Sequence, residues 1–248
     1  MAQLMRTANP ALSDRVFRGL PYSAGEGMTL EGTVNKTGLL LLCSIATAAW
    51  TWHMFAQAPE SAMPLTFAGG IGGFIFAMIT AFKKEWAAVT APIYALLEGL
   101  LLGGISAVVN LRFPGIAMQA VGLTFLTLMV LLLAYRTGII HVTQRFRLGV
   151  VAATGAIFVL YLGEFVLGFF GIHFAAINNS SPLSIGISLV ICAVAALNLV
   201  LDFDFIENGV RVGAPKYMEW YAAFGLMVTL VWLYIEILRL LTKVRSRN

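Results

Sequence analysis

The chain has 248 residues, of which 59% are hydrophobic and only 11% are charged. A soluble domain carries roughly 25% charged residues, so this composition excludes a soluble globular protein and predicts an integral membrane protein. The net charge of +4 is small. The expected partners are therefore membrane lipid and small ions, with no nucleic acid.

The first 37 residues form the first predicted unit. They contain three arginines, two prolines and several glycines, but no apolar stretch, so they do not have the pattern of a signal peptide. We predict a cytoplasmic, mostly irregular tail over 1–37, with a short amphipathic turn around 12–20. Residues 38–248 are expected to form a single transmembrane domain.

Seven apolar segments follow, each long enough to cross a bilayer as a helix. Short loops join them, so consecutive helices run antiparallel. The predicted fold class is an all-α integral membrane protein, a bundle of seven transmembrane helices. The predicted spans are 38–55, 62–82, 87–109, 116–135, 148–170, 182–201 and 221–241.

The lysines and arginines are distributed asymmetrically between the two faces of this bundle. With seven spans, the face that holds the N-terminal tail carries eleven of them, whereas the other face carries only Arg112 before the C-terminal tail. Basic loops stay in the cytoplasm, which predicts a cytoplasmic N-terminus. The basic C-terminal tail conflicts with this rule. Either seven full spans place it outside, which we favour, or the last segment is re-entrant.

Four carboxylates lie within or at the edge of the apolar segments: Glu98, Glu164, Asp202 and Glu236. A charge at that depth costs several kcal/mol unless it is paired, protonated or hydrated. These residues are therefore candidates for an ion or proton pathway.

Neighbouring residues leave alternatives open for two of these acids. Asp202 and Asp204 are two residues apart, so on a helix they point to nearly opposite sides, and both acids could instead lie at the membrane surface and be solvated. Glu236 precedes Arg239 by three residues, which allows a local ion pair. The lysines closest to the bundle interior are Lys83 and Lys84.

Enzyme chemistry has little support in the sequence. There is no glycine-rich nucleotide loop and no Cys–His metal pattern, and Cys43 and Cys192 lie inside apolar runs. We expect no catalytic residues and no cofactor. Pairs of glycines four residues apart, at 69 and 73 and at 99 and 103, indicate close helix packing inside the bundle.

Six short motifs follow one another along the chain in an order that resembles the Bax inhibitor family of membrane proteins, in particular its bacterial YccA-like branch. The resemblance covers nearly the whole chain. The motifs are NPAL at 9–12, TVNKT at 33–37, APIYALLEG at 91–99, YRTG at 135–138, DFDFIE at 202–207 and EWY…WLYIEILR at 219–239.

The resemblance implies a central C-terminal helix wrapped by six others, and a pH-sensing pair of acids on the sixth and seventh helices with a basic partner on the second. The sixth-helix acid overlays Asp202, and the basic partner overlays Lys83 or Lys84. The seventh-helix acid overlays Glu236, but an alignment on the terminal Leu-Leu-Arg places Thr229 there instead. Asp202 and Glu236 would then be the calcium ligands, with Asp204, Glu98 and Glu164 along the pathway.

Three functions are compatible with this sequence. The leading hypothesis, implied by the resemblance, is a pH-sensitive calcium leak channel of the bacterial inner membrane, since carboxylate oxygens suit a hard cation. The alternative is a non-conducting regulator that modulates, or is a substrate of, a membrane-bound AAA protease. A proton-coupled transporter is a third hypothesis, but the chain has no visible inverted repeat.

Overall fold

The computed structural model describes residues 27–171, 174, 177 and 179–247. Within these residues, seven helices are long and apolar enough to cross a membrane, which confirms the predicted fold class. The amphipathic turn expected at 12–20 lies outside the described residues. The helices are α1 (Leu30–Gln57), α2 (Pro59–Phe82), α3 (Ala87–Arg112), α4 (Ile116–Arg136), α5 (Gln144–Gly168), α7 (Pro182–Arg211) and α8 (Met218–Arg247), with a short 3-10 helix η3 (Lys84–Trp86).

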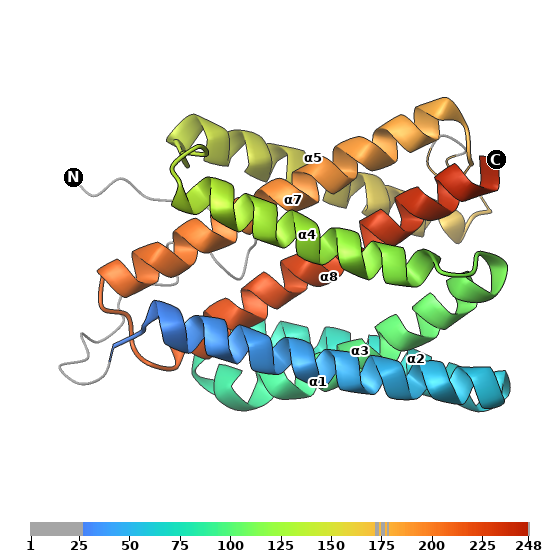
Figure 1. Ribbon diagram of the computed structural model, residues 1–248, viewed down its shortest axis with the longest axis horizontal. Coiled ribbons are helices and arrows are strands. Elements are labelled where there is room, and N and C mark those ends of the chain that lie inside the picture. The colour runs from blue at the N-terminus through green and yellow to red at the C-terminus, as the bar shows by residue number, and fades with distance from the viewer. Residues whose placement is uncertain (1–26, 172–173, 175–176, 178, 248) are drawn as a thin grey trace.

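The C-terminal helix α8 forms the centre of the bundle. Figure 1 shows α8 crossing obliquely between one group made of α1, α2 and α3 and another made of α4, α5 and α7. It packs against α1, α3, α4 and α7, while α2 packs on α1 and α3, and α5 packs on α7. Most residues of α8 between Met218 and Lys243 are buried. The expected central position of the last helix is therefore confirmed.

Most helices are longer than hydropathy predicts, and α1 and α7 are each ten residues longer. α1 begins at Leu30, so residues 30–37 of the predicted irregular tail are helical. The Thr29 side chain caps this helix by accepting a hydrogen bond from the Gly32 amide. α7 continues to Arg211, ten residues past the predicted end at 201. Both extensions are rich in polar residues, which a hydropathy window rejects, and the fold pairs some of them, such as Lys36 and Asp204.

α8 is one uninterrupted helix of 30 residues, about 45 Å long at 1.5 Å per residue. That length exceeds the roughly 30 Å of a bilayer's hydrocarbon core. The re-entrant alternative is therefore not formed, and the start of α1 and the end of α8 lie at opposite ends of the bundle (Figure 1). A backbone bridge between Gly27 and Pro215 fixes the start of α1 beside the α7–α8 loop.

Glycines allow α3 to approach α1 and α2 very closely, as the spacing of these residues predicts. A Cβ atom at Gly99 would lie 2.2 Å from the Ser44 carbonyl oxygen of α1, and one at Gly103 would lie 2.3 Å from that of Ala48. At Gly69 of α2, a Cβ atom would lie 2.6 Å from the Leu97 carbonyl oxygen of α3. These glycines therefore serve contacts inside the bundle.

Replacing Gly99 by leucine is expected to lower the free energy of unfolding by about 1–3 kcal/mol, because the new side chain would collide with the α1 backbone. Gly122→Leu on α4 is the control, since a Cβ atom there meets nothing within 4 Å. Thermal unfolding in detergent would measure both variants. Equal melting temperatures for the two would contradict this account of α1–α3 packing.

Candidate functional site

Asp202 lies inside the protein, in a turn of α7 where Leu199, Val200, Leu201 and Phe203 are also buried. Its exposed fraction is 0%. Neither of its carboxylate oxygens accepts a hydrogen bond of good geometry from any described residue. An ionised carboxylate in such surroundings is strongly disfavoured, so it must take up a proton, water or a cation.

The polar group that faces Asp202 from the central helix is the hydroxyl of Thr229. Thr229 is itself buried, and its hydroxyl donates a 3.3 Å hydrogen bond to the Gly225 carbonyl oxygen one turn earlier on α8. No charged side chain of the described residues acts on the Asp202 carboxyl group. The two residues thus form a small polar site in an apolar interior.

Glu236 lies elsewhere on α8. It is seven residues beyond Thr229, which is about 10 Å along a helix. Its Oε1 accepts hydrogen bonds from the Tyr161 hydroxyl at 2.8 Å and from the Trp232 indole at 3.3 Å. Arg239 is 4.0 Å from its Oε2, so the local pair expected from the sequence is formed loosely. Asp202 and Glu236 therefore do not share one site.

The residue that the structure places opposite Asp202 is Thr229, the alternative raised by the second alignment of the last helix. Thr229 and Glu236 both point inward from α8, because a spacing of seven residues returns to the same helix face. The sequence could not decide between them, since the choice depends on the axial position of α8 against α7.

Asp204 has a different neighbour from Asp202, as their spacing predicts. Its carboxylate forms an ion pair with Arg147 of α5 and accepts a 3.1 Å hydrogen bond from the Asn208 amide. Arg147 is buried, with 6% of the residue exposed. Asp204 is therefore a half-buried acid with an ion-pair partner, whereas Glu207 on the next turn is exposed.

The basic partner expected for Asp202 is not in place. Lys83 lies one residue past the end of α2, and Lys84 begins η3. Asp202 is nine residues inside the end of α7, about 14 Å along the helix. Neither lysine pairs with it, because the lysines sit at the end of the bundle and Asp202 lies deeper.

The remaining predicted acids occupy separate places. Glu98 is buried near the middle of α3, with its side chain against Gly73 of α2. Glu164 of α5 is half-buried and acts electrostatically on Lys243 of α8. The structure thus distributes the five candidate acids over the bundle. Within the described ranges there is no group of three or more His, Cys, Asp or Glu residues able to hold a metal ion.

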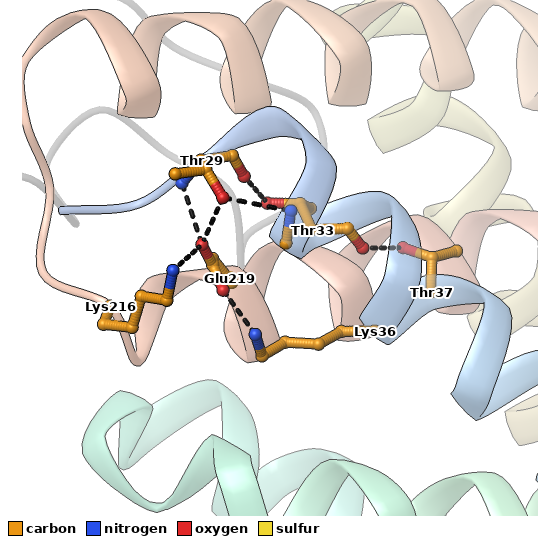
Figure 2. A network of polar contacts seen from close by, with 7 residues as sticks. Thr29, Thr33, Lys36, Thr37, Lys216 and Glu219 are labelled. Atoms are coloured by element: carbon orange, nitrogen blue, oxygen red, sulfur yellow. Dashed lines mark hydrogen bonds and ion pairs between the residues drawn. The ribbon is translucent and has the colours of Figure 1, made fainter. Parts of the chain in front are cut away.

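A further buried acid, Glu219 in the first turn of α8, was not singled out from the sequence. It is completely buried. Figure 2 shows its carboxylate accepting from the amide and hydroxyl of Thr29 and pairing with Lys36 and Lys216. Gly32 makes room for it, since a Cβ atom there would lie 2.3 Å from Oε1.

The Glu219 network joins the start of α1 to the start of α8. The sequence did contain a signal for a polar contact on α1. Thr29, Gly32 and Lys36 follow one another at spacings of three and four, so they share one helix face. The partner on that face is about 190 residues away in the chain, so the pairing itself was not predictable.

Glu219→Gln is expected to lower the free energy of unfolding by about 2–3 kcal/mol, because Lys36 and Lys216 lose their counter-charge. Glu31→Gln is the control, since Glu31 lies in the exposed first turn of α1. Thermal unfolding in detergent measures both. A Glu219→Gln protein as stable as Glu31→Gln would show that the network contributes nothing.

Seven helices of spanning length around a buried central helix, with carboxylates in the interior, define a polytopic integral membrane protein. The sequence matches the family described as Bax inhibitor 1 like over residues 9–246, and the chain belongs to that family. The search of curated proteins and the search of solved structures each gave no match. Assignment to the YccA-like branch, and the absence of enzyme activity, stay predictions.

Proposed function

We propose that this protein is a pH-sensitive leak pathway for cations, with calcium as the permeant ion, in the bacterial inner membrane. The observation that carries the proposal is Asp202, a wholly buried carboxyl group that lies beside the Thr229 hydroxyl but accepts no hydrogen bond of good geometry from the described residues. A proton and a cation would compete for this group, so the occupancy of the site would depend on pH.

Calcium prefers six to eight oxygen ligands, and the described residues offer no dense carboxylate cluster. In this proposal calcium keeps most of its water and meets the Asp202 carboxylate and the Thr229 hydroxyl at one point. Glu236, about 10 Å further along α8, is the second acid of the pathway. The two acids then mark successive positions rather than a single chelating site.

The orientation follows from the basic residues. The ends of α2, α4 and α7 and the start of α1 share one end of the bundle and carry Lys36, Lys83, Arg136 and Arg211. We propose that this end faces the cytoplasm, because short basic loops are retained there.

Purified protein in sealed liposomes that contain a calcium dye tests the proposal. The expected result is calcium entry faster than in empty liposomes, at rates that differ between pH 6 and pH 8. Retention of an entrapped anionic dye is the control for intact liposomes. Entry no faster than in empty liposomes at either pH would refute the leak function and leave the non-conducting regulator as the better hypothesis.

A further inference from the structure

From Arg147 onward, the polar residues of α5 lie along one stripe of this helix. Between residues 147 and 168 its polar side chains are Arg147, Thr154, Tyr161 and Glu164, at spacings of seven, seven and three. Those spacings place them on one helix face. All four are buried or half-buried, whereas the other faces of α5 expose large apolar side chains such as Phe158, Val159 and Phe165.

Each residue of this stripe faces a polar partner on α7 or α8. Arg147 pairs with Asp204, and the Asn198 amide donates a 2.9 Å hydrogen bond to the Thr154 hydroxyl oxygen. Tyr161 donates to Glu236 at 2.8 Å, and Glu164 acts on Lys243. Lys243 is buried and donates a 2.7 Å hydrogen bond to Ser188 of α7. We name this set of contacts the α5 seam.

The α5 seam is long enough to cross most of a membrane. From Arg147 to Glu164 the helix rises about 26 Å, compared with roughly 30 Å for the hydrocarbon core. Apolar packing contributes little to holding α5, since Arg147 and Val150 are its only two fully buried residues. The polar contacts are therefore a substantial part of what joins α5 to the rest of the bundle.

Acids and bases alternate along the α5 seam, with Asp204 beside Arg147 and Glu236 beside Arg239. Each acid has a base next to it, so the closed seam is close to electrically neutral. A cation that enters can replace the base as the partner of the acid. Polar groups in lipid are costly, and when they line a continuous face they mark ion pathways.

The α5 seam also passes next to Asp202. Asn198, which bonds to Thr154, is one helical turn before Asp202 on α7, and only 2% of Asn198 is exposed. A hydrated cation moving along the seam would therefore reach the Asp202 carboxyl group, about 14 Å inside the end of α7.

We propose that the α5 seam is the water-filled route by which cations cross this protein, between α5 on one side and α7 and α8 on the other. The inference rests on the proposed leak function and specifies its route. It excludes a route through the group of α1, α2 and α3, where glycines bring the helix backbones into close contact.

Cysteine labelling in liposomes tests the route. In a background with Cys43 and Cys192 replaced by alanine, Thr154→Cys introduces a thiol on the seam. Ala156→Cys is the matched control, because Ala156 is exposed on the opposite side of α5, about 3 Å away along the helix. The reagent is a cationic, membrane-impermeant methanethiosulfonate.

Thr154→Cys is expected to react at least about tenfold faster than Ala156→Cys, because only a hydrated thiol ionises and meets a charged reagent. Its modification is expected to reduce calcium entry severalfold. Ser188→Cys on α7, with Leu189→Cys as its control, repeats the comparison from the other wall, where Ser188 is buried and Leu189 is 59% exposed.

Labelling does not depend on ion flux, so the two proposals fail separately. Equal, slow labelling of both pairs in a protein that leaks calcium would overturn the seam as the route. A protein that does not leak at all refutes the proposed function, whatever its labelling rates.

Discussion

Asp202→Asn is expected to leave the protein folded and to remove the pH dependence of its calcium leak. Asparagine has the size of a protonated aspartate but cannot lose a proton, so the variant should leak at the low-pH rate of the wild type at every pH. We expect the wild-type rate to change about tenfold between pH 6 and pH 8 and the variant rate less than about twofold, since a single titrating group governs the response.

Glu207→Gln is the control for this experiment. Glu207 lies on the same helix, five residues further along, but its side chain is 54% exposed. Its replacement should leave the pH response of the leak unchanged. An Asp202→Asn protein that keeps the wild-type response would show that another group senses pH.

Arg147→Gln is expected to lower the free energy of unfolding by about 3 kcal/mol, because it leaves the Asp204 carboxylate inside the bundle without its counter-charge. The ion pair joins α5 to α7, and α5 has little other packing. The double variant Arg147→Met with Asp204→Leu should recover most of the loss, since it removes both charges. Unfolding by heat or by denaturing detergent measures all three proteins.

Arg145→Gln is the matched control for Arg147→Gln. Arg145 is two residues earlier on α5 and exposed, so its loss should change stability by less than about 0.5 kcal/mol. An Arg147→Gln protein as stable as Arg145→Gln would mean that the buried pair does not hold α5 in place.

The sequence was sufficient for the seven helices and the central last helix, because a bilayer imposes both length and apolarity on every span. It was insufficient for the helix ends. The polar start of α1 is helical because Thr29 caps it. The acidic end of α7 is helical because Arg147 of α5 pairs with Asp204 there. Neither a local cap nor a distant ion-pair partner leaves a trace in local hydropathy.

The buried acids could be found from the sequence, but their partners could not. The cost of a charge in lipid identifies Asp202 and Glu236 without any structure. Which side chain each one meets depends on the rotation and axial position of the helices. Thus Thr229 rather than Glu236 faces Asp202. The buried base Arg147 of α5 pairs with Asp204 and not with Asp202.

The central claim is that a proton and a calcium ion compete for the Asp202 carboxyl group. Adding calcium to the purified protein in weakly buffered detergent at pH 7, with a pH indicator present, measures this competition directly, since a cation that binds a protonated ligand releases its proton. We predict proton release from the wild type and from Glu207→Gln, and none from Asp202→Asn. No release from the wild type, or equal release from Asp202→Asn, would contradict the account.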